Sequence, residues 1–290
     1  MKLRLISDLH LDVNARVPFE LKDRDTFTLV AGDVAGDPYL AVKWLKENVH
    51  NGIAVAGNHI VYNRLNMPIE DIRELFAREM PPDAGLAYLD CLTKDKVFFK
   101  ELNGILFIGS TLYTDYGSKF DHETCKPRPQ TNLVRYNMEQ GYWSLNDFRW
   151  GRTRENVKSD GSAGSLLPQH CLNWFRDTLL AFDAKLNEIE RERPDMPVVV
   201  ITHHCPSTGC IAPVYHGSPL NSSFVSDLDW FIKKHSSIRL WHCGHVHSRF
   251  QFKVGGCLVV VNPRGYCRMS EDTDWNSELA VDTDTWEVIE

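Results

Sequence analysis

The stretch Leu3-Arg4-Leu5-Ile6-Ser7-Asp8-Leu9-His10 joins a short apolar run to an Asp-x-His pair near the start of the chain. The apolar run predicts a buried strand, and the polar residues that follow mark its end. Side chains alternate between two faces along an extended segment, so Asp8 and His10 are expected to point to the same side. There, the carboxylate and the imidazole can bind one metal ion.

Two more strand candidates in the first quarter of the chain end at similar polar clusters. Residues 28–31 are followed by Gly32-Asp33, and residues 53–56 are followed by Gly57-Asn58-His59. The glycines allow tight turns directly after these strands and close packing around a metal ion. Helical patterns lie between the strands, which predicts an α/β fold with functional side chains at strand ends.

The second half of the chain repeats this arrangement with histidines. Residues 198–202 precede His203-His204, and residues 239–242 precede Gly244-His245-Val246-His247. Further strands are expected at 86–89, 97–99, 105–108, 250–254, 258–261 and 279–281. Helices are expected at 39–49, 69–80, 172–189 and 224–234.

The chain is expected to form a single domain over residues 1–290. Its 43% hydrophobic content can fill a large core, and neither a repeat nor a linker divides it. Residues 115–169 show no sustained periodicity and are interpreted as an insertion or lid over the active site. The basic and aromatic residues of this segment suit either nucleotide binding or a solvated lid.

Composition excludes several classes of protein. The formal net charge of -7 argues against binding to extended nucleic acid. No apolar stretch approaches the length of a membrane span, so no membrane partner is expected. The eight cysteines form no close CxxC pair, which indicates reduced thiols in a cytoplasmic protein. Cys205 and Cys210 beside the two histidines do not show the regular ligand pairs of a structural zinc site.

Each polar cluster taken alone is common in proteins. A Gly-Asp pair is often only a turn, and an Asn-His pair after glycine can be a left-handed turn beside a structural histidine. Five such clusters, each after an apolar run, instead point to a metal centre. Mixed carboxylate, imidazole and amide ligands suit Mn, Fe or Zn better than calcium.

In this order the clusters resemble the motifs D-x-H, G-D, G-N-H-(E/D), H and G-H-x-H of the calcineurin-like metallophosphoesterase superfamily, in a bacterial or phage-type form. The resemblance spans the chain from Asp8 to His247. It implies a four-layer αββα sandwich, in which two mixed β-sheets are flanked by helices and carry a dinuclear metal site at strand ends.

The resemblance also implies the cofactors and their ligands. Two divalent metal ions are expected, with Mn favoured and Fe, Zn or Ni as alternatives. The implied ligands are Asp8, His10 and His247 for the first ion, and Asn58, His203 and His245 for the second, with Asp33 bridging both.

A hydroxide between the two ions would then attack phosphorus, and His59 would stabilise the developing charge or protonate the leaving group. The family often has an acidic residue where Ile60 stands here, so His59 is expected to act more as a hydrogen-bond donor. His204 is an alternative ligand to His203, and otherwise lies behind the ligands or faces the substrate. Arg264, in a turn that resembles the Asn-Pro-x-Gly-Tyr turn of some members, is a candidate phosphate contact.

The expected function is hydrolysis of phosphomonoesters or phosphodiesters of a small molecule or nucleotide. A metal-dependent nuclease and a protein phosphatase of the same fold remain as alternatives, as does a non-catalytic protein-binding scaffold. The sequence indicates neither the physiological substrate nor the oligomeric state.

Overall fold

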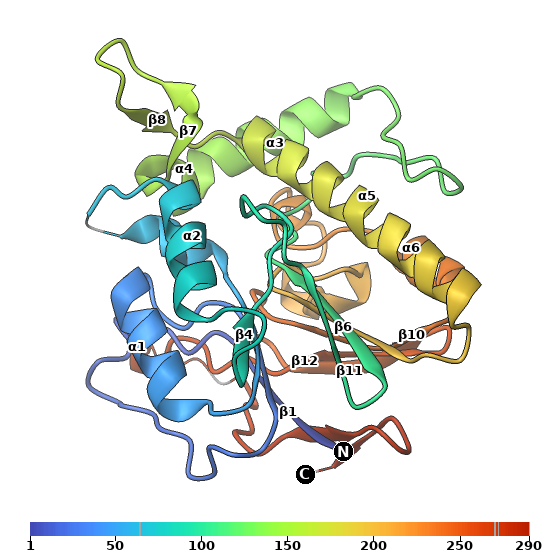
Figure 1. The fold of residues 1–290 in the computed structure, drawn as a ribbon. Helices are drawn as coiled ribbons and strands as arrows, with labels where there is room; N and C mark the ends of the chain where they lie inside the picture. The colour runs from blue at the N-terminus through green and yellow to red at the C-terminus, as the bar shows by residue number, and fades with distance from the viewer. Residues whose placement is uncertain (64, 270, 272, 290) are drawn as a thin grey trace.

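The computed structural model describes residues 1–63, 65–269, 271 and 273–289 (Figure 1). Two six-stranded β-sheets pack face to face, and helices cover their outer sides, which confirms the predicted αββα sandwich. The first sheet has the order β14 (Glu287–Ile289), β13 (Ala280–Asp282), β1 (Lys2–Ile6), β2 (Thr28–Ala31), β3 (Gly52–Val55) and β4 (Leu86–Tyr88). The second has the order β11 (Phe250–Val254), β12 (Cys257–Val261), β10 (Ile238–Cys243), β9 (Val198–Thr202), β6 (Ile105–Ser110) and β5 (Phe99–Leu102).

The remaining elements surround these sheets. A small hairpin is formed by β7 (Arg152–Val157) and β8 (Ala163–Ser165). The α-helices are α1 (Pro38–Asn48), α2 (Ile69–Glu79), α3 (Asn132–Ser144), α4 (Asn146–Trp150), α5 (Pro168–Glu192) and α6 (Asp229–Lys234). The 3₁₀ turns are η1 (Asn58–Tyr62), η2 (Thr208–Cys210), η3 (Pro213–Tyr215), η4 (Asn221–Ser223) and η5 (Cys267–Met269). No helix in the described part of the chain is long and apolar enough to cross a membrane.

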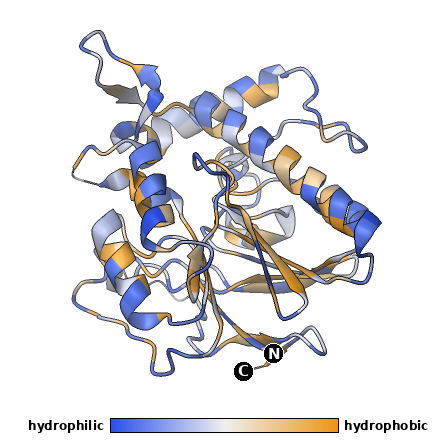
Figure 2. Ribbon diagram, in the orientation of Figure 1, coloured by the Kyte–Doolittle hydropathy of each residue, from blue (hydrophilic) through white to orange (hydrophobic). Residues whose placement is uncertain are grey.

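The central strands are apolar on both faces because each sheet is buried on both sides. In β2, Leu29 packs in the core between the sheets, whereas Val30 packs in the core beneath the helices. In β9, Val199 likewise packs between the sheets, and Val200 packs beneath the helices. Such strands are continuous apolar runs, as parallel sheets covered by helices require. Figure 2 shows the hydrophobic strands inside and mainly hydrophilic outer faces on the helices.

The direction of the strands places the site. Strands β1, β2, β3 and β4 run parallel in one sheet, and β6, β9, β10 and β12 run parallel in the other. Ser7, after β1, forms a parallel bridge with Pro263, after β12, and Gly244 N–H donates to the His203 carbonyl (2.9 Å). The carboxyl ends of both sets of strands therefore meet at one edge of the sandwich.

Most predicted elements are found, with changed ends. The helix expected at 224–234 begins only at Asp229, because residues 221–223 form the separate turn η4. The strand expected at 97–99 instead runs from Phe99 to Leu102, antiparallel to β6. The hairpin β7–β8 and the edge strand β14 were not predicted.

The segment 115–169 is not irregular, contrary to the sequence-based expectation. It forms α3, α4, β7, β8 and the start of α5, near the top of Figure 1. Thr131 caps α3 by accepting a hydrogen bond from Val134 N–H (3.3 Å). Helix α3 packs against α5 and η4, and α4 packs against η1, which carries Asn58 and His59. The segment thus forms a wall beside the site.

Asp115, at the start of this segment, gives the folded protein a pH-dependent stability. Burial raises the pKa of its carboxyl group to about 7, although the Gly117 N–H donates to it (2.7 Å) and opposes the rise. The unfolded chain binds fewer protons than the folded chain between the usual pKa of 3.8 and about 7, so stability falls as the pH rises through this window.

We expect Asp115→Asn to remove this fall, because the amide cannot ionise and still accepts the Gly117 hydrogen bond. The variant should gain stability relative to the wild type by at most about 4 kcal/mol near pH 8, and little near pH 4. Urea unfolding at both pH values measures the difference, with the exposed Asp95→Asn as control. An identical pH dependence in the variant would contradict the assignment.

Candidate metal centre

The loops that follow the strands hold five of the predicted ligands in left-handed backbone. The φ angles are 53° at Asp8, 45° at His10, 51° at Asp33, 73° at His245 and 44° at His247. The expectation that Asp8 and His10 lie on extended backbone is therefore wrong, and the same holds for His245 and His247. Residues other than glycine rarely adopt this conformation, and they do so mainly where function imposes it.

Two glycines of the motifs are needed because the ligand carboxylates lie against their backbone. A Cβ atom at Gly57 would overlap Oδ1 of Asp33, and one at Gly244 would overlap Oδ2 of Asp8. The carboxylates thus approach the neighbouring loops closely. The N–H of His245 donates to both oxygens of Asp8 (3.0 and 3.1 Å), which fixes the orientation of that carboxylate.

The first group of predicted ligands comprises Asp8, His10 and His247. Nε2 of His10 lies 2.9 Å from Nε2 of His247 and 3.9 Å from Oδ1 of Asp8. Nε2 of His247 lies 3.6 Å from the same Asp8 oxygen. One nitrogen or oxygen atom from each residue is thus close to the other two, as binding of a single ion requires.

The second group comprises Asn58, His203 and His245. Nδ1 of His203 is 2.8 Å from the Ala31 carbonyl, which directs Nε2 toward Oδ1 of Asn58 (2.9 Å). The ring of His245 lies edge-on to that of His203, with centroids 5.0 Å apart. Nε2 of His245 is buried and has no hydrogen-bond partner among the described residues, as expected of an atom reserved for a metal ion.

Asp33 lies between the two groups. Its Oδ2 is 4.0 Å from Nε2 of His10 and 3.3 Å from Nε2 of His203. Burial alone would raise the pKa of Asp33, but the charges of His203 and His59 outweigh burial and hold it well below its usual value. An ionised carboxylate in this position suits a bridge between two cations.

The protonation of the buried histidines also fits metal binding. Burial lowers the pKa of His10 and of His245 well below the usual value, so both rings are neutral and able to bind a metal ion. Burial opposes charge on His203 as well, but the charge of Asp33 and its hydrogen bond raise the pKa of His203 to about 9. Metal binding at this group would therefore release a proton from His203.

His59 lies beside both groups and has a phenolic partner. Its Nε2 is 3.0 Å from the hydroxyl of Tyr266 and 3.8 Å from Oδ2 of Asp33. Its backbone N–H donates to Oδ1 of Asp33 (2.9 Å). Tyr266 belongs to the Asn-Pro-x-Gly-Tyr turn, so this turn, rather than Ile60, supplies a polar side-chain partner of His59. The sequence contained the turn, but only Arg264 in it was considered as a contact.

The inserted segment contributes Asp147 through a short hydrogen-bonded chain. Tyr62 donates its hydroxyl proton to Oδ2 of Asp147 (2.7 Å), and Asn58 Nδ2 donates to the Tyr62 oxygen (3.3 Å). The ring of Tyr62 also contacts His59, with centroids 4.2 Å apart. Sequence reasoning missed both residues, because nothing in the pattern around position 147 separates it from other acids of the segment.

Glu271 orients His247 from outside the first group. Its Oε2 lies 2.9 Å from Nδ1 of His247 and also accepts a hydrogen bond from the Tyr266 N–H (2.8 Å). Burial disfavours the charged ring, but this hydrogen bond and the charge of Asp8 raise the pKa of His247. No motif marks Glu271, which follows His247 by 24 residues.

We expect Glu271→Gln to weaken metal binding at the first group by roughly 10- to 100-fold, because a neutral amide orients and polarises the His247 ring less well. Titration of the chelated protein with Mn²⁺, with bound metal counted after rapid gel filtration, measures the change. Glu278→Gln, at an outlying ion pair with Arg4, serves as the matched control. Unchanged affinity in the Glu271 variant would remove this residue from the centre.

The structure does not bring the two candidate substrate contacts to the cavity described below. His204 is buried behind His245, with ring centroids 4.3 Å apart, and burial lowers its pKa to about 3. The Arg264 side chain is 5% exposed and donates to the Val17 carbonyl (2.6 Å). Instead, the backbone N–H groups of Arg264 and Gly265 hold the Asp8 loop by donating to Ser7 and Asp8 carbonyls (both 3.0 Å).

A cavity of about 420 Å³ opens over the two groups of ligands. Its base includes Asp33, Asn58, His59, His245 and His247. Its walls come from residues 144–147 of the inserted segment and from residues 210–225 between β9 and α6. The apolar wall residues are Leu145, Ile211, Ala212, Leu220, Phe224 and Val225. No Lys or Arg occurs among the lining residues that the structure describes.

No protein-family model and no curated protein matches the chain. Among solved structures, the phosphopantetheinyl hydrolase from Mycobacterium tuberculosis is similar, with a TM-score of 0.61 at 15% identity over 92% of this chain and 90% of that chain. A putative 5'-nucleotidase from Staphylococcus aureus has a TM-score of 0.49 at 12% identity, over 99% of this chain and 51% of that chain. A dimetal phosphatase from Danio rerio has a TM-score of 0.45 at 13% identity, over 92% and 88%.

The likeness to the hydrolase shows a common fold, which is the αββα sandwich expected from the resemblance to the calcineurin-like metallophosphoesterases. At 15% identity this likeness shows the fold alone. The ligand geometry of this chain rests on its own residues, which form adjoining groups able to hold metal ions.

Proposed function

We propose that this protein is a dinuclear metal-dependent phosphoesterase that hydrolyses small phosphate esters. The observation that carries the proposal is the position of Asp33. A single oxygen of this carboxylate, Oδ2, faces a histidine of each ligand group at the base of an open cavity. Neighbouring proteins of the same fold include a phosphopantetheinyl hydrolase, which is consistent with this chemistry.

Two bound divalent ions would lower the pKa of a water molecule between them and neutralise charge on the phosphate oxygens. The side chains of this protein would position the ligands and assist the leaving group. Asp33 keeps the two ligand groups together, and Glu271 holds the ring of His247. His59 borders the cavity and is placed to donate a proton or a hydrogen bond to the leaving oxygen, while Tyr266 fixes its ring.

The cavity favours a substrate with one phosphate group and an apolar alcohol. Six apolar side chains of the wall segments line it beside several polar ones, and Phe224 stacks on His245 with centroids 4.6 Å apart. The absence of Lys and Arg from its described lining offers no binding for further phosphates. We therefore favour a small phosphomonoester or phosphodiester over a polyanion, and a nucleotide fits only if its base lies against the apolar wall.

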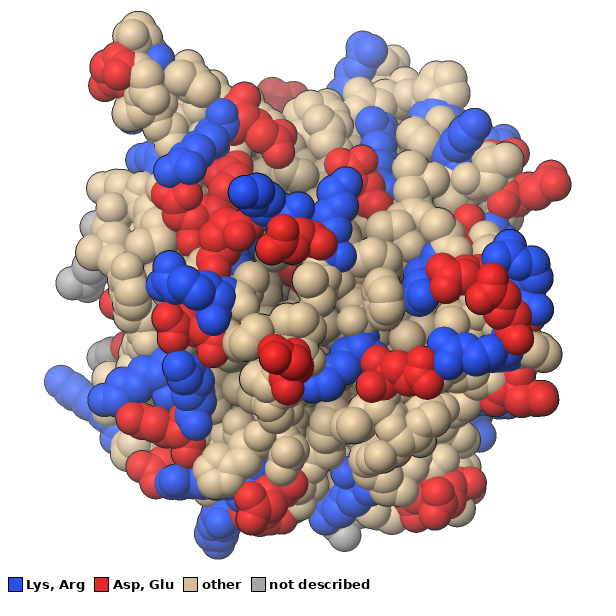
Figure 3. Space-filling model, in the orientation of Figure 1, with Lys and Arg blue, Asp and Glu red and all other residues tan. Residues whose placement is uncertain are grey.

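A nuclease is the less favoured alternative. Nuclease action on long strands needs a basic groove that follows the phosphate backbone. On the face shown in Figure 3, basic and acidic side chains are intermixed without a continuous basic track. The cavity has no basic track either, because no Lys or Arg occurs among its described lining residues.

The test is hydrolysis of bis-p-nitrophenyl phosphate and p-nitrophenyl phosphate by chelated protein reloaded with Mn²⁺, Ni²⁺, Zn²⁺ or Mg²⁺. We expect metal-dependent turnover, with Mn²⁺ as the best activator and about two Mn²⁺ ions per chain. Comparison of n-hexyl phosphate with glycerol 3-phosphate tests the apolar wall, because both have alkyl leaving groups and kcat/KM should be higher for the apolar ester. Absence of turnover with every metal in the folded protein would overturn the proposal and favour a binding scaffold.

A further inference from the structure

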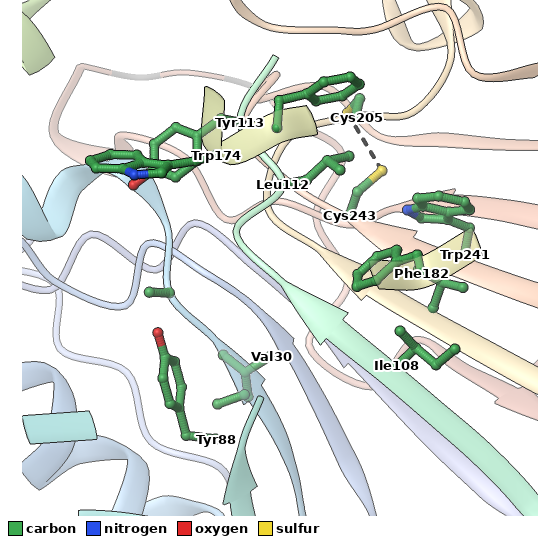
Figure 4. Close-up of a cluster of buried hydrophobic side chains, with 14 of the residues drawn as sticks. Val30, Tyr88, Ile108, Leu112, Tyr113, Trp174, Phe182, Cys205, Trp241 and Cys243 are labelled. Atoms are coloured by element: carbon green, nitrogen blue, oxygen red, sulfur yellow. Dashed lines mark hydrogen bonds between the residues drawn. The ribbon is translucent and has the colours of Figure 1, made fainter. Parts of the chain in front are cut away.

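A second group of metal-binding side chains lies behind the centre just described. Cys205, Cys210 and Cys243 are fully buried, and their sulfur atoms all lie within 4.8 Å of one another. Sγ of Cys205 is 3.5 Å from Sγ of Cys243, and Figure 4 shows these two sulfurs facing each other beside Leu112. None of the three is used by the proposed hydrolysis.

The three cysteines come from different parts of the fold. Cys205 follows the His203-His204 pair after β9, Cys210 ends the turn η2, and Cys243 ends β10 immediately before Gly244-His245. The sequence suggested at most a site of Cys205 and Cys210 with the neighbouring histidines. The structure instead directs His203 to the centre and brings in Cys243 from the adjacent parallel strand.

The spacing of the sulfurs suits a thiolate-bound ion. With metal–sulfur bonds of about 2.3 Å, three sulfurs around one ion are separated by about 4 Å. The sulfurs of Cys205 and Cys243 are 3.5 Å apart, and the other two separations do not exceed 4.8 Å, so the group is compact enough for this geometry. A disulfide between Cys205 and Cys243 would need only two of these thiols and gives no role to the third.

Other buried cysteines of the described chain do not gather in this way. Cys91 is bonded to hydroxyl groups of Ser110 and Thr178, and Cys257 lies on β12 with the Leu258 carbonyl as its partner. Neither belongs to a group of candidate metal ligands within the described residues. Among the described cysteines, the close grouping of Cys205, Cys210 and Cys243 is therefore a feature of the loops that carry His203 and His245.

The three cysteines border the cavity through Cys210, and a carboxylate oxygen lies on the neighbouring helix α6. Cys210 lines the cavity over the metal centre, although its residue is otherwise buried. Oδ1 of Asp229, on α6, is buried without a hydrogen-bond partner in the described structure, and its negative charge acts on Cys210.

We propose that Cys205, Cys210 and Cys243 bind a third, soft metal ion of the Zn²⁺ or Cu⁺ class, separate from the two ions of the hydrolytic centre. Thiolates select such ions over Mn²⁺ and Mg²⁺. The ion ties the loop after β9 to the end of β10, and so holds the backbone from which His203 and His245 project. Its role is structural, and it does not depend on the proposed hydrolysis.

The test uses Cd²⁺ as a spectroscopic probe of thiolate binding in the reduced, chelated full-length protein. We expect one Cd²⁺ per chain to produce the ultraviolet sulfur-to-cadmium charge-transfer band, in addition to ions bound by the histidine and carboxylate groups. Cys210→Ser should lose this band at stoichiometric Cd²⁺ and bind one ion fewer. Cys257→Ser, at a buried cysteine outside this group of three, should keep the band and the full number of bound ions.

If the Cys210 variant does not fold, the Cd²⁺ titration of the wild-type protein alone tests the proposal. Binding of Cd²⁺ without the thiolate band would overturn the proposal, as would an undiminished band in a folded Cys210→Ser protein. Peptide mapping of the protein isolated without reductant provides a second measurement. A quantitative Cys205–Cys243 disulfide there would replace the metal site by a redox pair.

Discussion

Asp33→Asn is expected to abolish metal-dependent turnover, with a loss on the order of 10³-fold or more, because both ligand groups share this carboxylate. Its Oδ2 faces His10 and His203, whereas Oδ1 only accepts the His59 N–H. The amide keeps the size and that hydrogen bond but removes the negative charge between the two cations. Both ions should therefore be retained less strongly.

Activity with p-nitrophenyl substrates and metal content after gel filtration give the two readouts for the Asp33 variant. Asp284→Asn is the matched control, since that side chain is 86% exposed near the N-terminus. Full activity with two retained ions in Asp33→Asn would show that Asp33 does not bridge. Loss of only one ion would assign it to a single group.

His59→Ala is expected to slow turnover by roughly a hundredfold or more while both metal ions remain bound. The imidazole borders the cavity, and its Nε2 contacts Tyr266 and lies within 3.8 Å of Asp33. It thus faces the substrate side of the centre. The loss should appear in kcat, because removal of a proton or hydrogen-bond donor affects the leaving group in the transition state.

The choice of substrate separates the two possible roles of His59. If it protonates the leaving oxygen, the loss is larger for an alkyl phosphate than for p-nitrophenyl phosphate, whose leaving group needs little protonation. His50→Ala is the control, at an exposed histidine paired with Asp25. Loss of a metal ion from His59→Ala would instead make His59 a ligand, since its nitrogen also lies close to His10 and Asp33.

The sequence predicted the strands that carry the site because their physical signal is strong. A strand buried on both faces is mainly apolar, and β1, β2, β3 and β9 are largely apolar runs that precede the polar clusters, although β1 includes the buried Arg4. The order of the clusters then sufficed to place the predicted ligands at one edge. What the pattern could not supply was the backbone geometry, which is left-handed rather than extended at Asp8 and His10.

Helix α3 was not predicted because its buried face is not apolar. Val134, Asn137 and Gly141 lie at helical spacing and are buried, but only the valine contributes to a hydrophobic pattern. Gly141 packs so closely that a Cβ atom there would press against Ser223. Periodicity of apolar residues cannot reveal such a helix.

The residues that orient the centre were missed for a different reason. Glu271 and Tyr266 meet His247 and His59 only after the chain has folded, across separations of 24 and 207 residues. Their roles depend on individual hydrogen bonds, which leave no spacing in the sequence. Arg264 was the more conspicuous candidate by charge, yet its side chain is held by the Val17 carbonyl.

The walls of the cavity and its base come from separate parts of the chain. The base consists of loops at the ends of central strands, whereas residues 144–147 and 210–225 form much of the walls. Under the proposed function, the residues that would select the alcohol are therefore largely separate from those that would hold the two hydrolytic ions. Changes in these wall residues other than Cys210 are then expected to alter the preferred ester without replacing a predicted ligand of either hydrolytic ion.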